Sequence, residues 1–153
     1  MKIVVASDHV GYTMKNELTL LMQNLGHTVI DVGTDNADKA EYPLYGRNAA
    51  EMVHRGEADR AVMVCGTGFG ISLAANTVRG VRCVNCSEPY TARLSRLHNN
   101  ANALALGARV IGSELAKMIV EVWLSTDFEG GRHAERIAKV DEMELSPIPG
   151  DKA

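Results

Sequence analysis

A cysteine at the end of a short apolar run is followed by a loop with a glycine at every second position. The segment is Val62-Met63-Val64-Cys65-Gly66-Thr67-Gly68-Phe69-Gly70. Glycines allow consecutive backbone N–H groups to turn toward one point, where they can bind an anion. A thiol beside such amides can move a proton while the amides hold the negative charge that results. The segment therefore predicts chemistry on a small anionic substrate.

Two nucleotide-binding motifs do not fit this loop. The dinucleotide fingerprint G-x-G-x-x-G opens the first β–α unit, whereas here the third glycine comes one residue early and the loop follows the third predicted strand. A P-loop needs Gly-Lys-Ser/Thr, which this loop lacks. Two structural alternatives stay open: the glycines serve only tight packing, and the strand-end cysteine is buried and inert.

Strand and helix patterns alternate along the chain. The predicted strands cover 3–6, 28–32, 61–65, 81–85 and 103–106, and the predicted helices cover 13–25, 42–56, 70–76, 87–97, 113–124 and 132–143, with Ser113 as a cap. Five β–α repeats without hairpin signals predict a three-layer α/β/α Rossmann-like fold with a five-stranded parallel sheet. We expect one domain over residues 1–145 and an exposed C-terminal tail over 146–153.

Parallel sheets of this kind bind ligands beyond the carboxyl ends of their strands. The residues at those ends are Asp8 and His9, the 65–70 loop, Ser87 and Glu88, and the segment 107–109. We expect them to meet in space. Asp8 could accept hydrogen bonds from sugar hydroxyls, although an N-cap or Asx turn explains an aspartate there equally well. His9 could donate to a phosphate.

Composition narrows the class of protein. The 153 residues are 46% hydrophobic, which is typical of a globular protein, and their net charge of -3 argues against general nucleic-acid binding. No apolar run reaches the roughly 20 residues that span a membrane, and the N-terminus is typical of a first strand, so we expect a cytoplasmic protein. Cys83 and Cys86 form a C-x-x-C motif without a second pair of ligands, so we predict no metal site there.

Five segments resemble those of the ribose-5-phosphate isomerase B family, which also holds allose-6-phosphate isomerases and galactose-6-phosphate isomerase subunits. They are residues 7–11, 64–70, 98–102, 106–112 and 129–136. The resemblance covers the chain except its tail. It implies a homodimer, with further pairing into tetramers left open, and an interconversion of an aldose phosphate with its ketose that needs no metal and no cofactor. One departure is Asn100, where the family often has aspartate; we expect an effect on packing only.

The resemblance also assigns roles. Cys65 is the candidate base, because family members that lack this cysteine use an acid a few residues later, whereas Ile71 and Ser72 are not acidic. His98 matches the histidine that opens the sugar ring, and Asn99 matches a substrate-binding position. A histidine at a helix C-terminus is also favoured by the helix dipole, which is the structural alternative for His98.

The remaining candidates bind substrate. The amides of Gly66, Gly68, Phe69 and Gly70 and both the amide and the hydroxyl of Thr67 would hold the enediolate oxygens, although a turn hydrogen bond also explains Thr67. Arg132 and Arg136 are four residues apart, so they share a helix face that suits a phosphate. Arg109 could join them. A solvated face with ion pairs is the alternative. In the family these arginines bind phosphate, and the last-helix pair reaches the site of the other subunit.

The leading hypothesis is an isomerase of ribose 5-phosphate and ribulose 5-phosphate. One alternative is the same chemistry on allose 6-phosphate, galactose 6-phosphate or an unphosphorylated hexose. A second alternative is a non-catalytic, anion-binding subunit of a hetero-oligomer. The presence of Cys65 together with His98 speaks against that second alternative.

Overall fold

The computed structural model describes residues 1–145 and contains one parallel β-sheet. The strands are β1 (Lys2–Ser7), β2 (Thr28–Asp31), β3 (Arg60–Cys65), β4 (Cys83–Asn85) and β5 (Ala103–Gly107). They lie in the order β2-β1-β3-β5-β4, and every neighbouring pair is parallel. The helices are α1 (Tyr12–Asn24), α2 (Tyr42–His54), α3 (Phe69–Ala75), α4 (Pro89–Asn99), α5 (Ser113–Ser125) and α6 (Arg132–Leu145).

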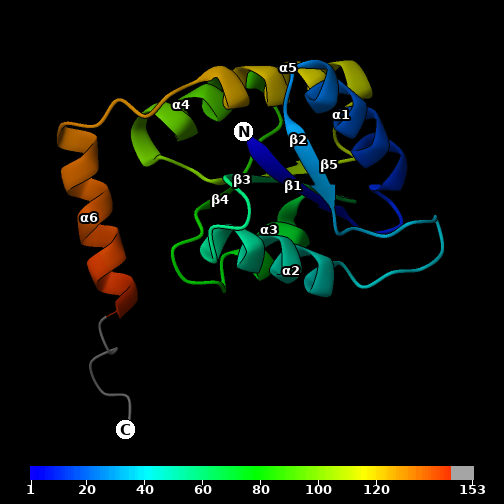
Figure 1. Ribbon diagram of the computed structural model, residues 1–153, viewed down its shortest axis with the longest axis horizontal. Coiled ribbons are helices and arrows are strands. Elements are labelled where there is room, and N and C mark those ends of the chain that lie inside the picture. Colours follow the sequence, from blue (N-terminus) through cyan, green and yellow to red (C-terminus); the bar gives the residue numbers. More distant parts are fainter. Residues whose placement is uncertain (146–153) are drawn as a thin grey trace, which may run out of the picture.

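Each face of the sheet is covered by helices, as Figure 1 shows. Successive side chains of a strand point to opposite faces. In β1, Ile3 and Val5 therefore join the core under α1, α4 and α5, while Val4 and Ala6 join the core over α2 and α3. Both sets are fully or almost fully buried. The predicted three-layer α/β/α fold with five parallel strands is confirmed.

A crevice is expected where the chain changes its winding direction. From β1 the chain crosses to β2 through α1 on one face, and from β2 it returns past β1 to β3 through α2 on the other face. Adjacent strands whose connections leave in opposite directions open a crevice beyond their carboxyl ends. Asp8 and Cys65 stand at this position, because β1 ends at Ser7 and β3 ends at Cys65.

Some helix and strand boundaries in the structure differ by a few residues from the predicted boundaries. Strand β4 begins at Cys83 rather than 81, because the Arg82 amide donates to the side chain of Asn102 at 2.7 Å. Gly112, not Ser113, is the N-cap of α5 and makes no side-chain cap, so the predicted serine cap is wrong. Helix α4 runs to Asn99 and ends because Asn100 adopts a left-handed φ of 46°, a conformation that asparagine tolerates.

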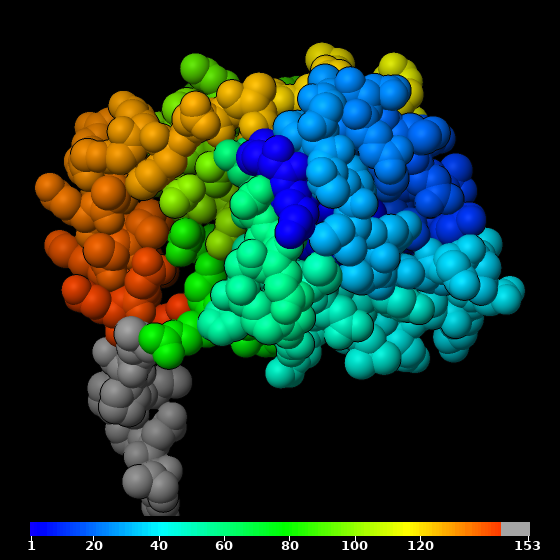
Figure 2. Space-filling view, viewed as in Figure 1, coloured from blue at the N-terminus to red at the C-terminus, as the bar shows by residue number. Residues whose placement is uncertain are grey.

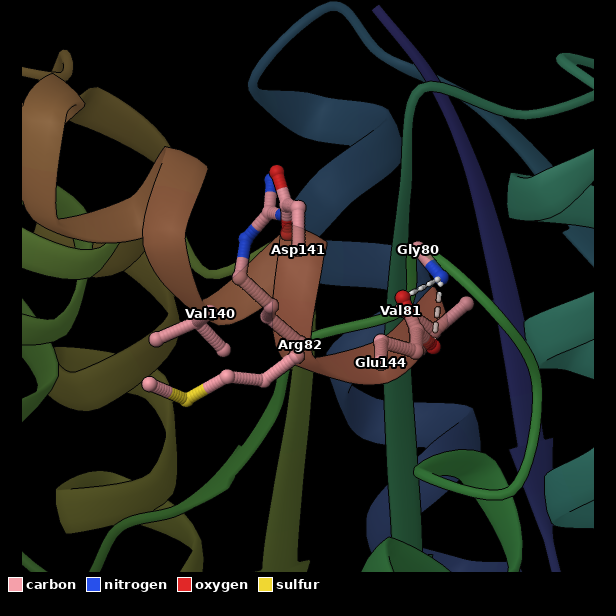
Figure 3. A pocket seen from close by; sticks show the side chains of 7 residues that line it. Gly80, Val81, Arg82, Val140, Asp141 and Glu144 are labelled. Carbon is pink, nitrogen blue, oxygen red and sulfur yellow. Dashed lines mark hydrogen bonds and ion pairs between the residues drawn. The ribbon is translucent and has the colours of Figure 1, made fainter. Parts of the chain in front are cut away.

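Helix α6 stands beside the α/β body and forms one side of the molecule (Figures 1 and 2). Near its end the Glu144 carboxylate accepts from the Gly80 amide at 3.1 and 3.2 Å, and Asp141 pairs with Arg82 at 3.2 Å (Figure 3). These contacts fix how α6 leaves the body. The predicted tail, 146–153, lies outside the described residues. Within the described part of the chain, none of the helices has the length and apolarity to cross a membrane.

Candidate active site

The sulfur of Cys65 lies against a backbone amide of the glycine loop. The Gly68 N–H donates to Cys65 Sγ over 3.1 Å, and Cys65 is 4% exposed. An amide that points at sulfur interacts more favourably with a thiolate than with a thiol. Gly68 makes this possible with a left-handed φ of +81°, and a Cβ added there would come within 2.6 Å of the Asn85 side-chain oxygen. The loop therefore requires glycine at this position for two independent reasons.

Two of the loop amides are already occupied within the loop. The Gly68 amide donates to sulfur, and the Phe69 amide donates to Thr67 Oγ1 at 3.3 Å. The alternative of a turn hydrogen bond at Thr67 is therefore observed. We expected all the loop amides to face substrate oxygens, but those of Gly68 and Phe69 already have acceptors inside the loop. The amides of Gly66, Thr67 and Gly70 remain as candidate oxyanion donors.

Asp8 and His9 are held by short local bonds beside this loop. Asp8 Oδ1 accepts from the amides of Val10 and Gly11, both at 3.0 Å, which is the Asx-type turn that was the structural alternative for this residue. Its second oxygen remains as an acceptor. His9 Nδ1 accepts from the Ala40 amide at 3.2 Å. An N–H can only donate, so Nδ1 carries no proton and His9 presents Nε2–H as a donor.

Arg109 and Tyr42 complete the surroundings of the loop. The Arg109 amide donates to the Gly66 carbonyl at 2.9 Å, and its guanidinium lies about 3.8 Å from where a Gly66 Cβ would stand. The ring of Tyr42 packs on Gly70, where an added Cβ would come within 2.6 Å of it. Nothing in the sequence alone pairs Tyr42 with this loop, because the contact joins segments 28 residues apart on α2 and α3.

Glu88 caps the N-terminus of α4. Its carboxylate accepts from the amides of Tyr90 at 2.6 Å and Thr91 at 2.8 Å, so it is the N-cap of the helix. Hydrogen bonds with Thr91, and then with Tyr90, lower the pKa of Glu88. Glu88 therefore follows β4 as expected, but its oxygens are used by the helix rather than by the crevice.

His98, Asn99, Arg132 and Arg136 lie at the opposite edge of the sheet. Helix α4 starts beyond the carboxyl end of β4 and runs back for 11 residues, so its ends are about 15 Å apart. Just past its last turn, the Asn102 side chain contacts Arg82 and Gly80, which precede β4. Within one chain the return helix therefore carries His98 and Asn99 away from the carboxyl ends of the strands.

His98 stacks on His133. The ring centroids are 4.2 Å apart and the planes differ by 9°. Glu129 Oε2 lies 3.9 Å from His98 Nε2 and 3.7 Å from His133 Nε2. Burial, followed by the charges of His98 and Arg132, lowers the pKa of His133, while Glu129 opposes this shift. Neither Glu129 nor His133 was among the predicted site residues.

These three side chains are also a group within residues 1–145 whose ligand atoms, all within 4.8 Å of one another, could hold a metal ion. The stacking argues against a shared ion. Nitrogen lone pairs lie in the ring plane, and two nearly parallel planes that are offset by stacking do not meet at one point. The prediction that catalysis uses no metal stays a prediction.

A family model described as Ribose/Galactose Isomerase matches residues 3–140. The chain belongs to the ribose/galactose isomerase family. It is 48% identical to ribose-5-phosphate isomerase B of Escherichia coli over 143 residues, which are 94% of this chain and 96% of that protein. The predicted resemblance is thereby confirmed.

Two further members of the ribose/galactose isomerase family mark its breadth. The solved structure of Clostridium thermocellum ribose-5-phosphate isomerase B is 50% identical with a TM-score of 0.93, covering 95% of this chain and 98% of that one. A D-erythrulose-4-phosphate isomerase of Pectobacterium atrosepticum is 38% identical over 145 residues, which are 94% of this chain and 95% of that protein. The family fold therefore carries isomerases named for different sugar phosphates.

Proposed function

We propose that this chain is an aldose–ketose isomerase that interconverts ribose 5-phosphate and ribulose 5-phosphate, with Cys65 as the base. The observation that carries the proposal is the Gly68 amide 3.1 Å from Cys65 Sγ, at the crevice where β1 and β3 end. Family membership and the 48% identity to a ribose-5-phosphate isomerase B support the substrate.

The chemistry needs one proton to move between neighbouring carbons. The Cys65 thiolate takes the proton from C2 of the open-chain aldose, and the electron pair of that C–H bond forms the C1=C2 enediolate with negative charge on O1. Sulfur then returns the proton to C1, while the O2 proton passes to O1 and C2 becomes the carbonyl. The candidate donors to the enediolate oxygens are the Thr67 hydroxyl and the amides of Gly66, Thr67 and Gly70.

Asp8, His9 and Arg109 bind the rest of the substrate on the same subunit. The second oxygen of Asp8 accepts from a sugar hydroxyl, because its first oxygen is used by the Val10 and Gly11 amides. His9 donates from Nε2, since Nδ1 is occupied by the Ala40 amide. Arg109 brings a permanent positive charge beside Gly66.

The other four residues act on the site of a second copy in a homodimer. Within one chain α4 runs back about 15 Å from its start beyond β4, so we assign His98 and Asn99 at its end to the site of a second copy. Beside the glycine loop, Phe69 is 66% exposed and Leu73 is 70% exposed. The two residues are four apart on α3, so they share one helix face, and contiguous exposed apolar side chains are typical of a partner contact. A second copy seated there would bring His98, Asn99, Arg132 and Arg136 to Cys65.

The compartment follows from the thiols. All three cysteines are free and buried, and free thiols persist in a reducing environment, so we place the enzyme in the cytoplasm. The proton shuttle needs no cofactor, because one proton leaves C2 and one proton is added at C1, with no net oxidation or reduction.

The test is a substrate panel on the purified chain alone, with and without EDTA. We expect the highest kcat/KM on ribose 5-phosphate, lower values on allose 6-phosphate and erythrulose 4-phosphate, and no effect of EDTA. A higher kcat/KM on another sugar phosphate would show that ribose 5-phosphate is not the preferred substrate. Inactivity of the isolated chain on every sugar, restored by a different partner chain, would instead support the anion-binding subunit.

A further inference from the structure

The His98–Glu129–His133 cluster brings together three elements. His98 comes from the last turn of α4, Glu129 from the segment between α5 and α6, and His133 from the first turn of α6. The Glu129 amide donates to the Leu97 carbonyl at 3.0 Å, and the His133 amide donates to the Gly130 carbonyl at 3.0 Å. The backbone therefore fixes the three side chains relative to one another.

The two imidazoles differ in their access to solvent. The His98 side chain is 35% exposed and lines an open pocket of about 540 Å³ together with Asn99, whereas the His133 side chain is 8% exposed beneath it. Within residues 1–145, His133 Nε2 is buried and has no hydrogen-bond partner. Only His98 is placed to meet a ligand, and His133 supports it from below.

The charged groups around the two rings also distinguish His98 from His133. The titratable and charged groups that face His133 are His98 on α4, Glu129 on the connecting segment, and Arg132 and Arg136 on its own helix. Burial and three of these four neighbours disfavour a proton on His133. The Glu129 carboxylate, 58% exposed at the mouth of the cluster, lies within ion-pair distance of a cationic His98. Glu129 is therefore close enough to His98 to offset positive charge that arises there, although it lies equally near His133 Nε2, at 3.7 Å.

We propose that Glu129 and His133 are positioning residues for His98: His133 is a neutral ring that fixes the plane of His98, and Glu129 balances the charge that His98 gains during ring opening. This inference rests on the ring-opening role of His98 in the proposed function. In that step His98 takes the proton from O1 of the cyclic sugar, the O1–H electron pair forms C1=O1, the C1–O4 bond breaks, and His98 returns the proton to O4.

The first experiment separates charge from structure. In the 15N-labelled protein, the ring nitrogen shifts of His98 between pH 5 and 8 report its proton occupancy. Glu129→Gln removes the negative neighbour of the cation, so we expect the transition to move to lower pH by an amount equal to about threefold weaker proton binding. Glu121→Gln, the same charge change at an exposed position on α5, leaves the transition in place. A curve for Glu129→Gln that overlays the unmodified protein would overturn the role of Glu129.

The second experiment tests the ring beneath His98. His133→Ala removes the stack, and we expect kcat/KM for ribose 5-phosphate to fall about fivefold. His133→Phe restores a flat ring without nitrogen and should recover kcat/KM to within about twofold of the unmodified protein. Equal losses in both variants, with unfolding midpoints unchanged, would overturn the stacking role.

The third experiment distinguishes the ring-opening role of His98 from the positioning roles of Glu129 and His133. The 4-deoxy analogue of ribose 5-phosphate lacks the hydroxyl that closes the ring, so it is always open-chain. We expect Glu129→Gln and His133→Ala to change kcat/KM for this analogue by less than about twofold, since ring opening is bypassed. If His98→Asn lowers kcat/KM equally for ribose 5-phosphate and for its 4-deoxy analogue, the ring-opening role of His98 is wrong. The ring nitrogen shifts of His98 still show, independently, whether Glu129 and His133 affect its proton occupancy.

Discussion

The amide of Gly68 points at the sulfur of Cys65 from 3.1 Å, and the left-handed backbone of Gly68 is what turns it there. The loop therefore supports the proposed base, the sulfur of Cys65, in addition to any substrate oxygen. Because two loop amides serve internal acceptors, the enediolate depends on fewer main-chain donors than a fully open nest would supply.

Replacement of Gly68 by alanine should cost both stability and activity. A left-handed alanine loses about 1–2 kcal/mol of stability, and its Cβ would also collide with Asn85, which moves the amide away from sulfur. Gly56→Ala is the matched control, since Gly56 has a φ of +70° with open space around it. Urea unfolding should show a lower free energy of unfolding in both variants, but only Gly68→Ala should lose turnover. Full activity in Gly68→Ala would remove the amide from the mechanism.

Arg136→Ala should raise KM for phosphorylated sugars about tenfold, because a charge-assisted hydrogen bond to phosphate is lost. The value of kcat should change much less. Arg55→Ala, which removes an exposed arginine paired with Glu51 and Glu57, is the control. Initial rates over a range of ribose 5-phosphate concentrations distinguish the two. An unchanged KM in Arg136→Ala would leave Arg136 as a solvated surface residue.

Two inactive variants should restore each other when their subunits are mixed. Cys65→Ala and His98→Asn impair different halves of each composite site, so a mixed dimer has one site with both changes and one site with neither. After unfolding and refolding together in equal amounts, we expect about a quarter of the normal activity, since half of the dimers are mixed. Recovery no greater than the sum of the separate variants would contradict the assignment of His98 to the partner's site.

Acid should destabilise the protein partly through His133. Burial and nearby positive charge lower the pKa of His133 in the folded protein, so the unfolded chain binds the proton more tightly. The resulting stability is present above the unfolded value near 6.5 and is lost as the pH falls through and below it. The urea midpoint should therefore drop between pH 7.5 and 5.5, and His133→Phe should drop less. Parallel losses in the two proteins would show that His133 does not contribute.

The strands and the crevice could be predicted from the sequence because their signals are local. A continuous apolar run such as 3–6 indicates a strand buried on both faces, and the residues after such strands must gather at one edge. Asp8 and the 65–70 loop do so. Buried Lys15 had no such signal: its ammonium lies 2.6 Å from Asp31 and 2.6 Å from the Thr34 carbonyl, on segments far along the chain.

The separation of His98 from the strand ends within one chain follows from the path of α4. The family resemblance already assigned the last-helix arginines to the site of the other subunit, but it made no such assignment for His98 and Asn99. A helix that follows a parallel strand returns to the amino edge of the sheet, and α4 does this over its full length. The stacking of His98 on His133 joins two helices 35 residues apart, and no periodicity in either helix indicates it.

Deuterium transfer in heavy water tests the role of sulfur most directly. The purified enzyme and its Cys65→Ala variant are incubated with ribose 5-phosphate in D2O, and deuterium at C1 of ribulose 5-phosphate and at C2 of the recovered aldose is measured by mass spectrometry. We expect deuterium incorporation and turnover with the unmodified enzyme, and neither with Cys65→Ala, although that variant still binds the sugar phosphate. Exchange at an undiminished rate in Cys65→Ala would show that another group moves the proton.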